Sequence, residues 1–465
     1  MACRKPARRE WLPLTMMLFF ASRLAAASPA AEPERIVVLI SLDGLASFYV
    51  DDPQAEMPTL RELAAAGAQA PMKASAPTVT WPNHTTLVTG VQPARHGVLG
   101  NNYFDRASGK PVALISDPIY DKDQIVKVPT VYDLAKAAGR KTAAVRWPAI
   151  RAAKTLDWAV PDVASDEHLH QFTTPTLLDE CRQLGIWADG EATESGKRDI
   201  RIISDAMCLD VFQHILTRHQ PNLALLHLIN VDHVQHLDGP RSPGAYAAIK
   251  TVDEQVRAVW ETLRRDYPDR ATLLIVSDHG FAAIEQLLLP NVLLRQAGLV
   301  EAEGNRVSGG AVRLVVQGGS ALVYILDDTR HAAIEEQIKQ IFGRVRGIAS
   351  IAGPEQLKEH GLALPKDDPH SPDMILFAQE GYGFVDTAGG ESAVIERPER
   401  KGNHGHDENL PHLYATFIAW GVGIKPHKRL ELIDNTTVAP TVARLLGLAM
   451  PGTDRAPLAE AVSDY

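Results

Sequence analysis

Short apolar runs that lack polar alternation recur along this chain, and they restrict its possible folds more than any other feature. The first run, Ile36–Ile40, is rich in β-branched residues and has the pattern of a strand buried on both faces of a sheet. Helical patterns of apolar residues lie between several of these runs, at Met57–Gly67, Tyr132–Gly139 and Tyr246–Arg264. Strand–helix alternation over this length predicts an α/β fold, a three-layer sandwich with a mostly parallel central sheet. The further apolar runs are Thr142–Val145, Leu223–Ile229, Leu273–Val276, Met374–Phe377 and Ala415–Ala419.

The stretch from about residue 282 to residue 373 has a different pattern. Two apolar runs, Val312–Val316 and Ala321–Leu326, flank Gly318 and Gly319 as the strands of a hairpin would, and Ala332–Phe342 is an amphipathic helix pattern. We therefore expect a smaller α+β subdomain at residues 282–373. It is inserted into a main domain formed by residues 28–281 and 374–465, and the apolar run at Met374–Phe377 is expected to rejoin the main sheet.

The first 27 residues have the pattern of an export signal. Basic residues, among them Arg8 and Arg9, precede the apolar run Trp11–Ala21, which small residues follow at Ala25–Ser28. The apolar run is too short to span about 30 Å of hydrocarbon, which argues against an uncleaved anchor. We predict a signal peptide at residues 1–27, an exported protein, periplasmic or secreted, and no stable membrane insertion after signal removal. The sequence leaves open whether the signal is of the Sec or the twin-arginine type.

The charge balance restricts the partners of this chain. With 47 basic and 57 acidic residues the net charge is −10, which argues against a nucleic-acid polymer as a stable partner. Small phosphate esters stay possible, because a bound metal ion can supply positive charge locally. Cys181 and Cys208 could pair in an oxidising compartment or stay separate as buried thiols, and the sequence leaves both open.

Three of the predicted strands end in aspartates, namely Asp43, Asp232 and Asp278. In open α/β sheets ligands gather at the carboxyl ends of the strands, so these side chains are expected to meet. His236 lies four residues after Asp232 and would share a helix face with it, and His279 follows Asp278 directly. A mixture of carboxylates and imidazoles suits Zn²⁺ better than Mg²⁺ or Ca²⁺, although Mn²⁺ and Fe would also accept it.

Two further segments supply candidate groups for this site. The Gly-flanked loop Gly402–Asp407 contains His404 and His406. The segment Pro77–His84 contains Thr80, whose hydroxyl a metal could activate as a nucleophile, and Asn83, which could donate a hydrogen bond to a phosphoryl oxygen. On spacing alone, Thr78 and Thr85 are equally good candidates for the nucleophile.

The ordered set of motifs resembles the nucleotide pyrophosphatase/phosphodiesterase family of the alkaline phosphatase superfamily. The resemblance runs from about residue 36 to residue 450, and no single piece of it is decisive. The matching pieces are Leu42-Asp43-Gly44, Thr80-Trp81-Pro82-Asn83-His84, Leu87-x-Thr89-Gly90, His96-Gly97, Trp147-Pro148, Asp232-x-x-x-His236-x-x-Gly239-Pro240, Ser277-Asp278-His279-Gly280, Asn403-His404-Gly405-x-Asp407, Ala439-Pro440-Thr441 and Leu446-Gly447.

The resemblance implies two zinc ions per chain. One would be held by Asp232, His236 and His404, and the other by Asp43, Asp278 and His279, with Thr80 close to the second and coordinating a metal through its hydroxyl. Thr80 would form a covalent phospho-threonine intermediate, which water on zinc hydrolyses, and Asn83 would bind the phosphoryl oxygens. Two positions depart from the family pattern. His406 stands where an aromatic residue is common, which leaves it as a rival to His404, and Phe281 stands where Met is common.

The surroundings of Thr80 favour a diester over a monoester. Trp81 adjoins the nucleophile and could stack on a base or cover an apolar leaving group, with Trp147 and Tyr103 as further candidates; the alternative is that these rings belong to the core. A monoester dianion calls for an additional cation, and the Thr80 motif contains no arginine, Arg95 being the next one along the chain. We therefore expect an exported metal-dependent hydrolase of phosphodiester or phosphoanhydride bonds. Nucleotides, dinucleotide polyphosphates, lipids and choline esters stay open as substrates.

Several alternative functions can be ranked against this one. A phosphonoacetate hydrolase or a phosphomonoesterase would use the same metal pattern, and a non-catalytic exported binding protein would keep the fold without the reaction. A sulfatase would require a Cys or Ser at the start of a C/S-x-P-x-R motif. Neither Cys181 nor Cys208 begins such a motif. The sequence also lacks the G-x-x-x-x-G-K-[ST] loop of P-loop nucleotidases.

Overall fold

The computed structural model describes residues 1–2, 35–115, 119–163, 165–187, 204–396 and 398–463. Residues 35–465 form one compact unit, and apart from Met1 and Ala2 the predicted signal peptide lies outside the described residues. Of the helices in the described ranges, none combines the length and the apolar character needed to cross a membrane. The two cysteines of the compact unit, Cys181 and Cys208, are both buried and both free.

The main sheet contains nine strands in the described part of the chain, and most of its central pairs are parallel. β1 lies between β7 and β8 and is parallel to both, as β5 is to β6 and β7. β19 is antiparallel to β8 and to β2, so the sheet is mixed at one side. In spatial order the strands are β20 (Lys428–Arg429), β2 (Ala68–Lys73), β19 (Ala415–Gly421), β8 (Ala271–Val276), β1 (Ile36–Leu42), β7 (Leu223–Leu228), β5 (Thr142–Val145) and β6 (Trp158–Val160), with β21 (Ile433–Asp434) also beside β2.

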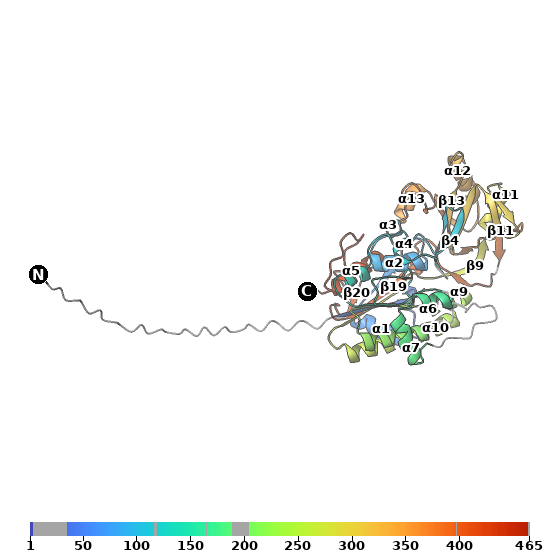
Figure 1. The fold of residues 1–465 in the computed structure, drawn as a ribbon. Helices are drawn as coiled ribbons and strands as arrows, with labels where there is room; N and C mark the ends of the chain where they lie inside the picture. The colour runs from blue at the N-terminus through green and yellow to red at the C-terminus, as the bar shows by residue number, and fades with distance from the viewer. Residues whose placement is uncertain (3–34, 116–118, 164, 188–203, 397, 464–465) are drawn as a thin grey trace. The chain divides into compact units, whose positions relative to one another are not determined.

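Helices cover both faces of this sheet, which confirms the predicted three-layer α/β sandwich. In β1, Val38 and Ile40 pack into one hydrophobic cluster, while Val37 and Leu39 pack into another on the opposite face. Figure 1 shows α1, α7 and α10 on one side of the sheet and α2 and α5 on the other. The first cluster takes residues from α1 (Pro58–Ala66), α7 (Pro175–Gln183), α8 (Asp205–His214) and α10 (Pro243–Asp266), and the second from α2 (Thr80–Thr89), α5 (Val131–Ala137) and α14 (Val438–Leu445).

Shorter elements connect these layers. The hairpin of β3 and β4 follows α3, and a π-helical turn extends α8. The bounds are α3 (Pro93–His96), β3 (Asn102–Asp105), β4 (Lys110–Ala113), α4 (Lys122–Ile125), α6 (Asp166–Phe172), the π-turn (Ile215–His219), α9 (Asn230–Asp238) and the 3-10 turns at Ser47–Tyr49, Pro411–Leu413 and Asn435–Thr437.

A smaller α+β part is inserted between β8 and β19. The predicted hairpin around Gly318 and Gly319 is present as β12 and β13, which pair antiparallel. Its principal sheet has the order β12 (Val312–Gln317), β13 (Ser320–Ile325), β15 (Met374–Ala378) and β14 (Ile348–Ala352). Around it lie α11 (Pro290–Gln296), β10 (Val300–Glu303), β11 (Arg306–Gly310), α12 (His331–Phe342) and α13 (Pro354–Glu359).

The expectation that Met374–Phe377 rejoins the main sheet was wrong. This segment is a strand, β15, but it pairs with β13 and β14 in the smaller sheet. Its residues alternate between two hydrophobic clusters, so the strand is buried on both faces there as it would be in the main sheet. An apolar run indicates that a strand is buried on both faces, but it does not indicate which strands lie next to it.

The chain first returns to the main sheet at β19. A further sheet precedes it, built from β16 (Gly381–Phe384), β9 (Ala282–Leu288) and β17 (Val394–Glu396), with β18 (Gly402–Asn403) also paired to β9. We therefore propose that the inserted part extends from residue 282 to about residue 403 rather than to residue 373.

Candidate metal centre and active site

The carboxyl ends of two neighbouring strands carry the first group of candidate ligands. Asp43 follows β1 and Asp278 follows β8, and both side chains are buried. His279 Nε2 lies 3.0 Å from Asp278 Oδ2 and 3.5 Å from Asp43 Oδ1. Asp43 Oδ1, Asp278 Oδ2 and His279 Nε2 are buried atoms without a hydrogen-bond partner among the described residues. Buried polar atoms are normally satisfied, so these three orphaned ligand atoms fit a cation.

The second group forms on α9 and on the loop after β18. Asp232 Oδ2 lies 3.5 Å from His236 Nε2, and Asp232 Oδ1 lies 3.4 Å from His404 Nε2. The other ring nitrogens face carbonyl oxygens: His236 Nδ1 is 3.2 Å from Gly402 O, and His404 Nδ1 is 3.0 Å from Thr78 O. A carbonyl can only accept, so these contacts require the proton on Nδ1 and leave Nε2 free as a metal ligand.

The two groups are adjacent, and Asp232 belongs to both. Ligand atoms of Asp43, Asp232 and His279 lie within 4.8 Å of one another, as do those of Asp232, His236 and His404. The rings of His279 and His404 stack with their centroids 3.7 Å apart. All six ligands predicted from the sequence are therefore brought together.

The electrostatics of this cluster favour a bound cation. Burial, together with the negative charges of Asp278 and Asp232, raises the pKa of Asp43 well above its ordinary value. Burial also acts to raise the pKa of Asp278, but His279 and His84 outweigh it and hold that pKa below its ordinary value. Three carboxylates at short range, two buried and one partly buried, repel one another, and divalent cations between them would relieve the repulsion.

The hydrogen bonds of the three threonines distinguish Thr80 from its rivals. Thr78 donates its hydroxyl to His406 O at 2.8 Å and accepts from Gly405 N at 3.1 Å. Thr85 donates to Trp81 O at 2.8 Å within α2. The hydroxyl of Thr80, at the first position of α2, has no such bond to any residue in the described part of the chain. Thr80 is the threonine whose hydroxyl is available.

Thr80 is also linked to the ligand cluster through the backbone. Its carbonyl oxygen lies 2.9 Å from His84 Nδ1, and that nitrogen is 3.6 Å from Asp278 Oδ2. Thr78, two residues earlier, binds the ring of His404 through its carbonyl oxygen. The segment that presents Thr80 is thus attached to both groups of ligands.

A family model of type I phosphodiesterases/nucleotide pyrophosphatases matches residues 37–407 of this sequence. The match includes all six candidate ligands and Thr80. The chain belongs to this family. The family membership confirms the resemblance drawn from the motifs.

Two of the most similar curated relatives match about half of this chain. An uncharacterized pyrophosphatase/phosphodiesterase of Schizosaccharomyces pombe is 29% identical over 255 residues, which is 53% of this chain and 44% of that protein. Ectonucleotide pyrophosphatase/phosphodiesterase family member 3 of Rattus norvegicus is 25% identical over 253 residues, covering 52% of this chain and 24% of that protein. The match thus spans less than half the length of either relative.

Solved structures share the fold of this phosphodiesterase-family chain. Murine ectonucleotide pyrophosphatase/phosphodiesterase 5 superimposes with a TM-score of 0.67 at 19% identity, covering 91% of this chain and 98% of that one. A second structure of the murine protein, an inactive Thr-to-Ala variant in complex with AMP, has a TM-score of 0.67 at 18% identity, with the same coverage of both chains.

Asn83 does not occupy the position expected of an oxyanion donor. Its side chain is fully buried, and Nδ2 faces the carbonyl oxygens of Ser75, Pro77 and Val79 at 3.2, 3.1 and 2.8 Å. Its Oδ1 accepts from Ser75 N at 2.7 Å. The amide is committed to the backbone before α2 and has no donor left for a phosphoryl oxygen, so Asn83 holds the segment that carries Thr80.

Asn101 is a candidate for that role, and sequence reasoning missed it. Its Oδ1 accepts from the N–H of Trp81, next to Thr80, at 2.9 Å. Its side-chain nitrogen Nδ2 makes no hydrogen bond to any other described residue, so it is a free donor next to the segment that carries Thr80. The residue lies outside the Thr80 motif, and no spacing rule connects the two. Only the turn between α3 and β3 brings them together.

The three aromatic residues predicted to bind substrate are buried. Trp81 and Trp147 are 1% and 0% exposed, and Tyr103 is 8% exposed. Trp81 and Tyr103 share a hydrophobic cluster with Leu114, and Trp147 packs edge-on against His84 with ring centroids 5.0 Å apart. The structure therefore does not present these rings as an open stacking platform. The three rings belong to hydrophobic clusters, which agrees with the alternative that they are core residues.

Two further histidines of the site bear on the ligand set. His227 lies within the otherwise apolar strand β7, and its Nε2 is 2.9 Å from Asp43 Oδ2. The sequence signal that could have predicted this contact is a single histidine within an apolar strand. His406, the rival of His404, is buried with Nε2 2.7 Å from Tyr382 O, away from the carboxylates that His404 faces. The structure thus favours His404 as the ligand.

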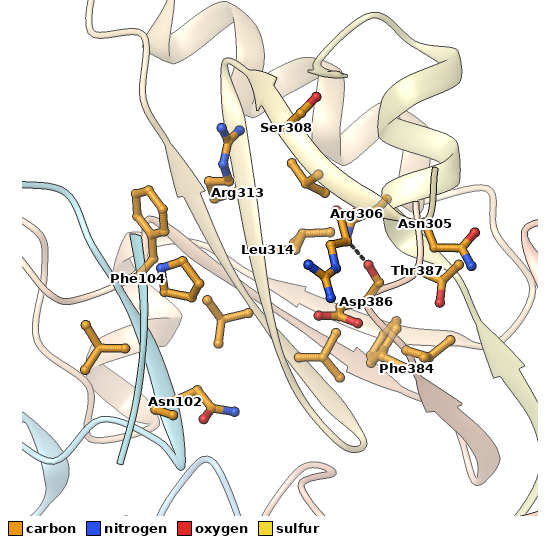
Figure 2. A pocket seen from close by; sticks show the side chains of 18 of the residues that line it. Asn102, Phe104, Asn305, Arg306, Ser308, Arg313, Leu314, Phe384, Asp386 and Thr387 are labelled. Carbon is orange, nitrogen blue, oxygen red and sulfur yellow. Dashed lines mark hydrogen bonds between the residues drawn. The ribbon is translucent and has the colours of Figure 1, made fainter. Parts of the chain in front are cut away.

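A cavity of about 850 Å³ lies apart from the candidate ligands. Figure 2 shows Phe104 and Asn102 on one side of it and Arg306, Arg313 and Asp386 on the other. None of the six ligands lines this cavity. It separates the β3–β4 hairpin from the inserted part and is not the site of the metal cluster.

Proposed function

We propose that this chain is an exported metal-dependent hydrolase of phosphodiester or phosphoanhydride bonds that uses Thr80 as its nucleophile. The observation that carries the proposal is a cluster of six candidate metal ligands, four of them buried, to which the segment that carries the free Thr80 hydroxyl is attached through His84 and His404. Export rests on the N-terminal sequence pattern, and venom phosphodiesterase of Macrovipera lebetinus, 24% identical over 442 residues, is consistent with it.

The residues present fit two divalent cations, for which zinc is the best match. Asp232, His236 and His404 would hold one, and Asp43, Asp278 and His279 would hold the other. Oxygen and nitrogen ligands in equal number suit zinc better than magnesium or calcium. When bound, the two ions supply Lewis acidity at the nucleophilic and leaving oxygens of an in-line displacement.

The residues of the chain carry out the rest of the reaction. The Thr80 hydroxyl gives its proton to solvent and its oxygen attacks phosphorus, while the bond from phosphorus to the leaving oxygen breaks and the leaving oxygen departs with the bonding electrons. The Nδ2 of Asn101 donates to the phosphoryl oxygens as their charge develops, and the N-terminus of α2 favours the same negative charge. Water then cleaves the phosphorus–oxygen bond to Thr80, which releases the phosphate product and restores the hydroxyl.

The substrate that we favour is a nucleotide ester or anhydride. A relative in Xenopus laevis, 21% identical over 419 residues, is named bis(5'-adenosyl)-triphosphatase. The murine structural neighbour binds AMP in its inactive Thr-to-Ala variant, which supports both a nucleotide substrate and a threonine nucleophile.

The test is hydrolysis of three p-nitrophenyl substrates by wild type, Thr80→Ala and Thr85→Ala. We expect wild type to prefer the thymidine 5′-phosphodiester and bis-p-nitrophenyl phosphate over p-nitrophenyl phosphate, and to lose activity with a chelator. Thr80→Ala should lose about 10³-fold or more in kcat while its metal content stays unchanged. Thr85→Ala, which loses only a bond within α2, should stay near wild type.

Each part of the proposal can fail separately in this test. Full activity of Thr80→Ala would refute the nucleophile. A preference for the monoester would refute the diester assignment and leave the metal centre in place.

A further inference from the structure

A third group of potential metal ligands lies far from the catalytic cluster. Glu180 on α7, His214 at the end of α8 and His219 at the end of the π-turn place one ligand atom each within 4.8 Å of one another. His219 precedes β7 by only a few residues, and its neighbour Trp158 begins β6. The group therefore lies at the amino ends of parallel strands whose carboxyl ends carry the catalytic site.

The π-turn is what brings the two histidines together. In a regular α-helix, residues five positions apart point in directions about 140° apart. Here Gln220 N–H donates to Ile215 O at 3.2 Å, the wider hydrogen-bond spacing of a π-helix, and His214 and His219 come onto one face. Their ring centroids are 5.6 Å apart. Single π-turns in α-helices occur frequently at functional sites.

Both imidazoles direct the same ring atom at the same carboxylate oxygen. His214 Nε2 lies 2.7 Å and His219 Nε2 lies 2.8 Å from Glu180 Oε2. In a tetrahedral zinc site with bonds of about 2.1 Å, ligand atoms are about 3.4 Å apart, so entry of an ion requires these atoms to separate by about half an ångström. The Glu180 side chain is 31% exposed, which leaves an approach from solvent.

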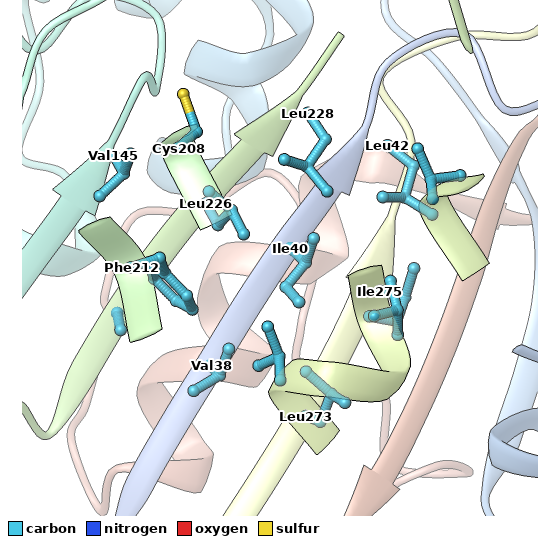
Figure 3. Close-up of a cluster of buried hydrophobic side chains, with 14 of the residues drawn as sticks. Val38, Ile40, Leu42, Val145, Cys208, Phe212, Leu226, Leu228, Leu273 and Ile275 are labelled. Atoms are coloured by element: carbon cyan, nitrogen blue, oxygen red, sulfur yellow. The ribbon is translucent and has the colours of Figure 1, made fainter. Parts of the chain in front are cut away.

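The surrounding packing fixes the orientation of the ligands. The Trp158 indole stacks on the His219 ring with centroids 4.4 Å apart and an angle of 21° between the planes. α8 is held on the sheet by Cys208 and Phe212, which lie in the cluster with Val38 and Leu226 (Figure 3). Ligands held by packing lose little entropy on binding a metal.

We propose that Glu180, His214 and His219 form a third divalent-cation site, of the two-histidine, one-carboxylate type that zinc fills. The protein supplies three ligands, and water completes the coordination. The ion would join α7 to the π-turn at the edge of the sheet opposite the active site, so its role is to stabilise this edge. The site stands whether or not the reaction proposed above is correct.

The test is the zinc content of the full chain after dialysis against buffered free Zn²⁺, measured by mass spectrometry of the metal. Glu180→Gln keeps the size of the side chain and removes the anionic ligand, and His219→Gln removes an imidazole. We expect each variant to hold one zinc ion fewer per chain than wild type, with unchanged phosphodiester hydrolysis. His331→Gln is the matched control, because His331 pairs with the carboxylate of Asp373 at 3.0 Å without a second histidine.

The comparison depends on a difference between variants and not on the total zinc content, so occupancy of the catalytic centre does not affect it. Zinc content equal to wild type in both Glu180→Gln and His219→Gln would overturn the proposal and identify the group as a hydrogen-bonded cluster. An equal loss in His331→Gln would also overturn it, because zinc would then bind histidines without selecting this site. If Glu180→Gln fails to fold, His219→Gln alone decides the outcome.

Discussion

A side chain can act on a substrate only if its neighbours leave one of its polar atoms free. Around α2 this condition separates residues of the same chemical type. The hydroxyl of Thr78 and the side-chain nitrogen of Asn83 bond to backbone groups, whereas the Thr80 hydroxyl and Asn101 Nδ2 keep an unused donor. Residue type nominates candidates for this site, and the hydrogen-bond partners decide between them.

The two asparagines are therefore expected to respond differently to substitution. Asn101→Ala should lower kcat by about 10²–10³-fold with little change in stability, because it removes a donor to the developing charge. Asn83→Ala should lower the melting temperature, because it removes the side-chain donor shared by the buried carbonyls of Ser75, Pro77 and Val79, of which Pro77 and Val79 keep only a backbone donor. Steady-state kinetics and thermal unfolding of both variants test this. A kcat for Asn101→Ala close to wild type would contradict it.

At the scale of elements, the site depends on the contact between the segment before α2 and the loop after β18. Thr78 binds Gly405 N and His406 O through its hydroxyl and His404 Nδ1 through its carbonyl oxygen. These bonds join the segment that carries Thr80 to the candidate ligand His404, which is distant in sequence. Each of the two elements is short and could not hold its side chains in place alone.

Removal of the Thr78 hydroxyl should weaken metal binding. Thr78→Val leaves a buried N–H and a buried carbonyl unpaired, each at a cost of about 1–3 kcal/mol, and lets the loop that carries His404 move. We expect a lower melting temperature and a lower zinc affinity, measured by competition with a zinc-binding dye. Thr89→Val is the control, since the Thr89 hydroxyl donates only to Thr85 O in the same helix. Equal zinc affinities in the two variants would contradict this prediction.

At the scale of the whole molecule, the candidate metal centre places several charged side chains next to the hydrophobic core. Asp43, Asp278 and His279 are almost completely buried, and their ligand atoms have no other partner in the described ranges. Without a cation, such a cluster opposes folding through repulsion and desolvation. Bound metal should therefore contribute to the stability of the whole fold as well as to the reaction.

Chelation should lower the melting temperature, and zinc should restore it. An ion that binds only the folded state at about a thousandfold excess over its Kd stabilises that state by about 4 kcal/mol. Magnesium at the same concentration should restore little, because it prefers oxygen ligands alone. Differential scanning calorimetry of the chelated and reloaded protein measures both effects. An unchanged melting temperature after chelation would refute the stabilising role.

The main sheet and the aspartates at the ends of its strands could be predicted because both follow from local features, whereas the assignment of His404 came from the family resemblance. A strand buried on both faces shows in its own residues, and a ligand at its carboxyl end follows directly, as Asp43 and Asp278 do. Contacts between segments that are distant in sequence could not be predicted from local features. β15 joined the smaller sheet instead of the main one, and Asn101 lies beside Trp81 only because of a turn outside the motif. The burial of Trp81 likewise depends on the residues that cover it.

The position of the inserted part has a consequence for how the protein is made. The ribosome produces Asp43 early, and the strands that end in Asp232 and Asp278 follow, but His404 emerges only after the inserted part has been synthesised. A chain that stops before residue 404 contains most strands of the main sheet and still lacks His404, one of the six candidate ligands. Metal loading at this centre would therefore require a nearly complete chain.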